Sequence, residues 1–301
     1  MTDILYSFWY LVPVTLVQSL MYATVAFGIM IPFRILNLPD LTCEGSLPLG
    51  GCLAAAFLTA GFNPYGATVL AVLAGALAGA ITAWLHLRFR IHSLLAGILV
   101  FTMLWSVNLR VLGKPNAPLP GGANMFDALS PEILASNWLQ VGLLGALAAA
   151  GTLVLIWLFR TEIGLSMRCV GVNERLAPAL AIRSAVYIVG GFALANAIVA
   201  FGGALLVQQQ GYADVTMGFG VLINGLAALI VGEAIVGRHT VARQMCAPLV
   251  GAIVYYQLLS LGLATGLHPS DLKFLTGLFV IATLALPRLL KRGGNSSALG
   301  L

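Results

Sequence analysis

The sequence has 301 residues, of which 60% are hydrophobic and only 8% are charged, and its mean hydropathy is +0.98. A soluble domain has roughly 25% charged residues, so this composition excludes an ordinary soluble protein. Several apolar runs reach about 18 residues, which is enough to cross a bilayer as a helix, and the short alternating segments of a β-barrel are not seen. The sequence therefore predicts an all-α polytopic membrane bundle, formed as a single domain over residues 1–301.

The first apolar segment covers residues 9–33 and has no Lys or Arg ahead of it. Because it carries no evident small-residue cleavage site, we interpret it as an uncleaved first span and not as a signal peptide. Eight more apolar segments follow, so the chain is expected to form about eight to ten transmembrane helices. These segments cover residues 47–61, 67–87, 94–113, 139–159, 184–207, 219–236, 244–266 and 274–288.

Two of these segments differ from an ordinary span. The segment 47–61 is short and follows a stretch rich in Pro, Gly and acidic residues, whereas the segment 219–236 is interrupted by glycines. Short or Gly-interrupted spans are candidates for broken helices that line a transport path. We therefore expect residues 40–51 and the span around Asn224 to approach a central cavity.

The distribution of Lys and Arg predicts the orientation, because cytoplasmic loops of membrane proteins are enriched in them. If nine spans alternate, only Arg110, Lys114 and Lys273 fall on one side, and the other twelve of the 15 basic residues fall on the opposite side. This bias predicts a cytoplasmic C-terminus and an outer N-terminus. It also accounts for the net charge of +5. No basic stripe is interleaved with aromatic residues, so no nucleic-acid partner is expected.

The longest predicted outer loop covers residues 114–138 and is rich in Pro and Gly. It is either a docking site for an extracytoplasmic partner or a plain solvated connection.

A compact, charged insert covers residues 160–182 on the predicted cytoplasmic side. Thr161 can cap a helix whose first turn carries Glu162, a favourable place for a negative charge. Gly164 and Gly171 would leave gaps in the helix surface for the side chains of a partner. The insert is therefore predicted to be a short helix on the membrane surface, and the alternative is an ordinary basic loop.

Polar side chains at membrane depth are candidates for a translocation path, because they are costly in lipid and tend to face the bundle interior or a cavity. We interpret Gln18 and Asn196 instead as partners in hydrogen bonds between helices. Glu233, about one turn from Arg238, is interpreted as a partner in an ion pair or a helix contact and not as part of a substrate site. The predicted path residues are Asp40, Thr42, Ser46, Gln208 and Asn224.

Motifs of enzyme chemistry are not found in the sequence. It contains no G-x-x-x-x-G-K-[ST] stretch to hold nucleotide phosphates, and no H-E-x-x-H motif or nucleophile elbow. The four cysteines, Cys43, Cys52, Cys169 and Cys246, show no C-x-x-C spacing, so neither a disulfide nor a metal site is expected. We expect a transport subunit with no catalytic residues and no cofactor of its own, in which any ATP is bound by a partner.

Three stretches, in order along the chain, resemble the permeases of bacterial ATP-binding-cassette importers of the branched-chain amino-acid and ribose type. Residues 40–46 resemble their D-L-S-x-G-S run with one extra residue, and residues 218–240 resemble their Gly-rich span, with Glu233 where a second Gly is common. The insert resembles their cytoplasmic coupling loop, with Cys169 and Ala181 replacing the usual Ala and Gly. The matching positions are Thr161, Gly164, Arg168, Gly171, Asn173, Ala177 and Ile182.

This resemblance implies a permease subunit in the bacterial inner membrane that carries a small polar solute. The expected partners are a cytoplasmic ATPase, an extracytoplasmic substrate-binding protein and a second permease copy in a homodimer. An amino-acid-like solute is favoured, because the similar branch is often grouped with binding proteins for aromatic amino acids. The residues expected to contact the ATPase are Thr161, Glu162, Gly164, Arg168, Gly171 and Asn173.

Two other classes of protein remain as alternatives. An ion-coupled secondary transporter would need a carboxylate near the bilayer midplane, but the acidic residues all fall at predicted span ends. A membrane-embedded enzyme would need a nucleophile or a metal cluster within a span, and none is recognised in the sequence.

Overall fold

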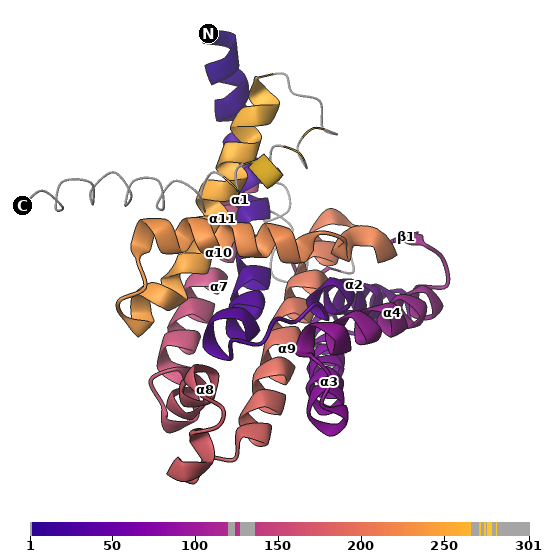
Figure 1. The fold of residues 1–301 in the computed structure, drawn as a ribbon. Coiled ribbons are helices and arrows are strands. Elements are labelled where there is room, and N and C mark those ends of the chain that lie inside the picture. Colours follow the sequence, from indigo (N-terminus) through magenta and orange to yellow (C-terminus); the bar gives the residue numbers. More distant parts are fainter. Residues whose placement is uncertain are drawn as a thin grey trace, which may run out of the picture.

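The computed structural model of the chain describes residues 2–119, 124–126 and 136–265, together with positions 271, 274, 276–278 and 281; for residues 2–8 it describes the backbone alone. Within these residues the fold is an all-helical bundle with a single two-stranded ribbon (Figure 1). The elements in chain order are α1 (Thr2–Met30), η1 (Ile31–Ile35, a π-helical turn), α2 (Cys43–Thr59), α3 (Pro64–Phe89), α4 (Ser93–Leu112), β1 (Asn116–Pro118), α7 (Asn137–Leu158), α8 (Glu162–Val172), η2 (Ala177–Leu180), α9 (Ser184–Gln210), β2 (Tyr212–Asp214), η3 (Val215–Gly218), α10 (Val221–Val236) and α11 (Val241–Ala264).

Helix boundaries follow from local chemistry at several ends. At the start of α3, the Asn63 side chain accepts the N–H of Tyr65 at 2.9 Å, and Pro64 occupies the first helical position. At the end of α4, Gly113 adopts a left-handed conformation with φ of 74°, and its N–H bonds to the Leu109 carbonyl. These caps place the start of the third apolar segment and the end of the fourth within a few residues of the predicted bounds.

Seven segments in the described residues are apolar and long enough to cross a membrane, and α2 is a shorter apolar helix of 17 residues. This agrees with the predicted all-α polytopic bundle. The ninth predicted segment, 274–288, lies mostly outside the described residues. The described spans are Trp9–Ile35, Pro64–Phe89, Ser93–Leu112, Asn137–Leu158, Ser184–Gln210, Val215–Val236 and Val241–Ala264.

Helix α9 is a central element of the bundle, packed closely against α2 and α3. A Cβ at Gly50 on α2 would collide with the Ala200 backbone, and one at Gly79 on α3 with the Phe192 carbonyl. Small residues at these crossings allow the backbones to approach each other closely. The glycines of α7 behave differently, since Gly142 and Gly151 make no close contact of this kind in the described structure.

The two short strands and α8 mark opposite ends of the bundle. β1 pairs antiparallel with β2, with Asn116 opposite Asp214, so the end of α4 and the end of α9 lie on one side. Helix α8 precedes α9 and lies at the end of the bundle away from the N-terminus (Figure 1). This arrangement agrees with the alternation on which the predicted orientation rests.

The two segments predicted to be broken are interrupted before their helices begin. Residues 36–42 are non-helical ahead of α2. The span Val215–Val236 is broken at Gly220, whose φ is 81°, so that α10 starts only at Val221. Gly225 and Gly232 do not break α10. They contact Ile29 on α1 and Ala247 on α11 instead.

Candidate functional site

The predicted surface helix is present as α8, but its start is built differently from the prediction. Thr161 stands at the N-cap position and makes no side-chain capping bond; its hydroxyl donates to the Leu158 carbonyl at 2.6 Å. Glu162 is exposed in the first turn. At the other end, Asn173 closes α8, and its side-chain oxygen accepts the N–H groups of Arg175 and Leu176 at 3.0 and 3.2 Å.

Gly164 and Gly171 face the protein's own bundle. A Cβ at Gly164 would collide with Leu158 and Phe159 at the end of α7, and one at Gly171 with the Ile35 carbonyl at the end of η1. The prediction that these glycines leave gaps for a partner is therefore wrong. Their small size allows α8 to lie close against its own chain.

The outward face of α8 and the turn after it are rich in exposed apolar side chains. Their exposed fractions reach 85% at Val172. Arg168 is half-buried, and Glu174 and Arg175 are exposed nearby. We call this the α8 surface, formed by Ile163, Leu165, Val172, Leu176 and Leu180.

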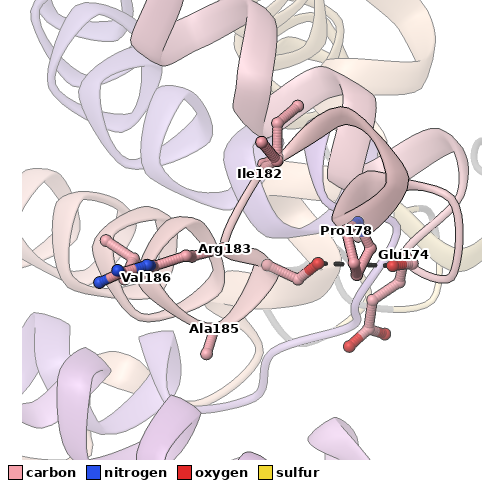
Figure 2. Close-up of a pocket in the computed structure, with 8 residues that line it drawn as sticks. Glu174, Pro178, Ile182, Arg183, Ala185 and Val186 are labelled. Carbon is pink, nitrogen blue, oxygen red and sulfur yellow. Dashed lines mark hydrogen bonds between the residues drawn. The ribbon is translucent and has the colours of Figure 1, made fainter.

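A pocket of about 640 Å³ lies beside the α8 surface, between the turn after α8 and the start of α9. Figure 2 shows Arg183 and Glu174 at opposite sides of it. The Ser184 hydroxyl donates to the Glu174 carbonyl at 3.4 Å. This end of the molecule therefore combines an apolar surface with a pocket that carries an acidic residue, Glu174, on one side and a basic residue, Arg183, on the other.

A buried polar cluster joins three of the predicted path residues. Asn196 on α9 donates to a carboxylate oxygen of Asp40 at 2.8 Å and accepts from the Ser46 hydroxyl at 2.7 Å. The Thr42 and Thr82 hydroxyls lie 2.7 Å apart, and the Thr42 N–H donates to Asp40 at 2.8 Å. All five residues are at most 1% exposed. The structure thus brings Asp40, Thr42 and Ser46 together, but inside the chain and not along an open cavity.

Asn196 was interpreted as a partner in hydrogen bonds between helices, and this interpretation is confirmed by its bonds to Asp40 and Ser46. Gln208 is also wholly buried. It accepts the N–H of Met125 at 3.0 Å and donates to the Thr68 hydroxyl at 2.9 Å. Its hydrogen bonds therefore tie α3, α9 and the segment around Met125 together.

Asn224 differs from the other predicted path residues because it is half-buried and borders a pocket. The pocket measures about 270 Å³ and is lined by Phe219, Gly220, Ile223, Asn224 and Thr276. The Tyr255 hydroxyl lies 3.2 Å from the Asn224 side-chain oxygen. Asn224 is therefore the predicted path residue that the structure leaves accessible.

An aromatic cluster stands at the edge of this pocket. The Phe219 ring lies 5.1 Å from the Trp105 ring and 5.8 Å from the Phe101 ring, centroid to centroid. Phe219 is half exposed. Close by, a carboxylate oxygen of Glu44 accepts the Gly220 N–H at 3.2 Å.

Glu233 lies in a buried ion pair near the end of α10. Its carboxylate is 2.6 Å from Arg34 on η1 and 3.5 Å from Arg238 after α10. The predicted pair with Arg238 is confirmed, whereas the shorter one with Arg34 was not predicted. Glu233 therefore connects two segments that are far apart in the sequence.

The described residues form a bundle of apolar helices, and the comparisons identify its family. The sequence matches the family described as branched-chain amino acid transport system / permease component over residues 13–284. The chain belongs to this permease family. Its membrane topology of many apolar helices agrees with that assignment.

Two curated proteins are similar to the permease over most of its length. It is 34% identical to a tyrosine transport system permease protein of Clostridioides difficile (strain R20291), covering 89% of this chain and 88% of that protein. It is 32% identical to an uncharacterized protein of Rickettsia prowazekii (strain Madrid E), covering 89% of this chain and 94% of that protein. No solved structure matches the permease significantly. The comparisons support the transport-subunit prediction and give no support to an ion-coupled transporter.

Several residues of the permease site were missed by the sequence reasoning. Thr68 and Thr82 both lie on α3, where a hydroxyl in an apolar helix gives no sign of a cross-helix bond, because it can bond to its own backbone. Phe101, Trp105 and Phe219 were missed because aromatic residues are common in membrane spans. Arg34 was missed because a basic residue at the end of a span is the ordinary pattern of a cytoplasmic end and indicates no partner.

Proposed function

We propose that this permease is the transmembrane subunit of an ATP-driven importer and that a separate cytoplasmic ATPase docks on the α8 surface. The observation that carries the proposal is the exposed apolar side chains of α8, such as Leu165 and Val172, on the side with the positive charge bias. An extended apolar patch outside the membrane is expected to be covered by a protein. ATP and its hydrolysis belong to that partner, because the sequence holds no phosphate-binding loop.

We propose that a second copy of the permease forms the other wall of the solute translocation path. The pocket beside Asn224 is open in the described part of the chain and carries a polar side chain at membrane depth. Such a group is expected to face protein or a water-filled cavity, and not lipid. A homodimer would close this pocket from the other side. A substrate-binding protein would deliver the solute at the end of the bundle that carries β1 and β2.

We propose an amino-acid-like solute with an aromatic side chain. A relative that is 34% identical is named a tyrosine transport permease. The cluster of Phe101, Trp105 and Phe219 offers a ring surface at the mouth of the pocket, and aromatic rings pack favourably edge to face or offset. Asn224 offers an amide for the polar end of the solute.

Uptake by proteoliposomes tests this function. The permease is reconstituted with a candidate ATPase and binding protein encoded beside it, and uptake of labelled tyrosine, leucine and ribose is compared. With the ATPase in the vesicle lumen and the binding protein outside, the proposal expects uptake that requires ATP in the lumen. Tyrosine should be imported faster than leucine or ribose. Uptake by the permease alone, driven by a proton or sodium gradient, would contradict it. A nucleotide-free sample with the same ion gradients is the control.

A further inference from the structure

Helix α8 is fixed to the short segment that follows the first span. The Asn37 side-chain N–H donates to the Gly171 carbonyl at 3.1 Å. Gly171 lies against the backbone of Ile35 and Leu36, and the buried side chains of Met167 and Val170 share one apolar cluster with that segment. Interiors packed this closely transmit displacements instead of absorbing them. A movement of α8 would therefore move residues 34–37.

The same segment is fixed to α10 by charge. The Arg34 guanidinium donates to Glu233 at 2.6 Å, and the Glu233 side chain is 3% exposed. The other Glu233 oxygen is buried and has no hydrogen-bond partner among the described residues. A buried carboxylate of this kind is held by its cations, and removing them would leave an uncompensated charge. The Arg34–Glu233 pair is therefore a firm connection.

The far end of α10 is the end that borders the candidate solute pocket. The helix begins after Gly220, and its first turns carry Ile223 and Asn224, which line that pocket. Glu233 lies in the last turn of the same helix. A shift of residues 34–37 would reach the pocket through a single rigid helix.

We propose that residues 34–37 form a linkage that transmits the movement of α8 to α10, and that Glu233 is a positioning residue for transport. This inference rests on the proposed function, since it takes the ATPase to dock on α8. In it, Asn37 holds the α8 end of the linkage and the Arg34–Glu233 pair holds the α10 end. Breaking either end uncouples ATP hydrolysis from solute movement, while the ATPase stays bound.

Two variants test the linkage at its two ends. Glu233→Gln keeps the side-chain shape but removes the charge that Arg34 binds. Asn37→Gly removes the amide that bonds Gly171, and glycine tolerates the left-handed backbone of this position, where φ is 54°. Because Asn37 lies outside the core, this second variant carries the test if Glu233→Gln fails to fold. Arg243→Gln, on the same side of the bundle, is the matched control, since Arg243 makes no ion pair in the described residues.

The measurement is the ratio of ATP hydrolysed to solute imported, in proteoliposomes holding permease, ATPase and binding protein. We expect this ratio to rise about tenfold or more in both linkage variants, a typical size for coupling between sites. Basal hydrolysis and co-purification of the ATPase should stay at the wild-type level, as should all readouts of Arg243→Gln. A wild-type ratio in both variants would overturn the linkage, and so would a parallel loss of ATPase binding. If the wild-type complex itself shows no ATP-driven uptake, the proposed function fails, and the linkage fails with it.

Discussion

Asn196 is the residue on which the buried polar cluster depends. It contacts Asp40 and Ser46, which lie more than 140 positions away in the sequence, and it links the segment before α2 to α9. The carboxylate of Asp40 has no cation within ion-pair distance in the described structure. Hydrogen bonds from neutral donors therefore have to satisfy it.

Replacing Asn196 with Ala is expected to destabilise the fold. The change leaves the Ser46 hydroxyl and one Asp40 oxygen buried without their partner, at a cost of about 1–3 kcal/mol for each group. Thermal unfolding of the purified protein in detergent measures the effect. Thr102→Ala removes an exposed hydroxyl that bonds only within α4 and should change stability by less than about 0.5 kcal/mol. Equal unfolding temperatures for the two variants would show that the cluster contributes nothing.

Ser46 and Asn224 should differ in their access to water. Ser46 is wholly buried, whereas Asn224 is half-buried at the edge of a pocket. With the native cysteines replaced, Asn224→Cys should therefore react with small polar thiol reagents, and Ser46→Cys should stay protected in every nucleotide state. Labelling of Ser46→Cys at the rate of Asn224→Cys would instead place the α2 segment on the path.

Among the elements, helix α8 was predicted from the sequence, but the way it packs against its neighbours was not. Its charge, its length and its place between two spans predicted a surface helix, and the helix is present. The sequence could not show whether Gly164 and Gly171 face a partner or the protein's own bundle, because this depends on how α7 and η1 pack against α8. Spacing within one helix does not define its neighbours.

Gly171 and Val172 provide a matched pair for testing this packing. Gly171→Trp would push the ring into the Ile35 carbonyl and should lower the stability of the permease by about 1–3 kcal/mol. Val172→Trp points outward from a position that is 85% exposed and should leave stability unchanged. Unfolding temperature and expression yield compare the two. A fully stable Gly171→Trp protein would mean that α8 does not rest on η1.

The two interruptions in the helices, at Gly220 and at the π-helical turn η1, differ in how well the sequence predicts them. Gly220 predicted the interruption ahead of α10, because a glycine can adopt the positive φ that the break requires. The π-helical turn at the end of the first span carried no comparable signal. Arg34 therefore looked like an ordinary basic residue after a span, although it reaches Glu233 across 199 positions.

For the whole molecule, the all-helical, multi-pass class followed from hydropathy, because lipid requires every spanning backbone to be helical or closed into a barrel. The tertiary contacts did not follow, since buried polar residues can find partners on any neighbouring helix. This is why Asp40, Ser46 and Gln208 were assigned to a path, although their side chains hold the bundle together.

The orientation of the molecule is tested by reporters. The charge bias predicts that the end carrying α8 is cytoplasmic and that the end carrying β1 and β2 is outside. A cytoplasm-only reporter should be active when inserted after Glu174 or fused after Leu301, and a periplasm-only reporter should be active after Pro115. The reverse activities would invert the assignment of the ATPase to α8.

The central claim is that an ATPase covers the α8 surface, and site-specific photo-crosslinking measures this directly. A photoreactive residue at Leu165, which is 63% exposed on α8, should form an adduct with the ATPase in native membranes. The same residue at Leu77, which is 65% exposed on the spanning helix α3, should not. An ATPase adduct from Leu165 alone is the predicted result. No adduct at Leu165, in membranes where the permease still imports its solute, would contradict the account.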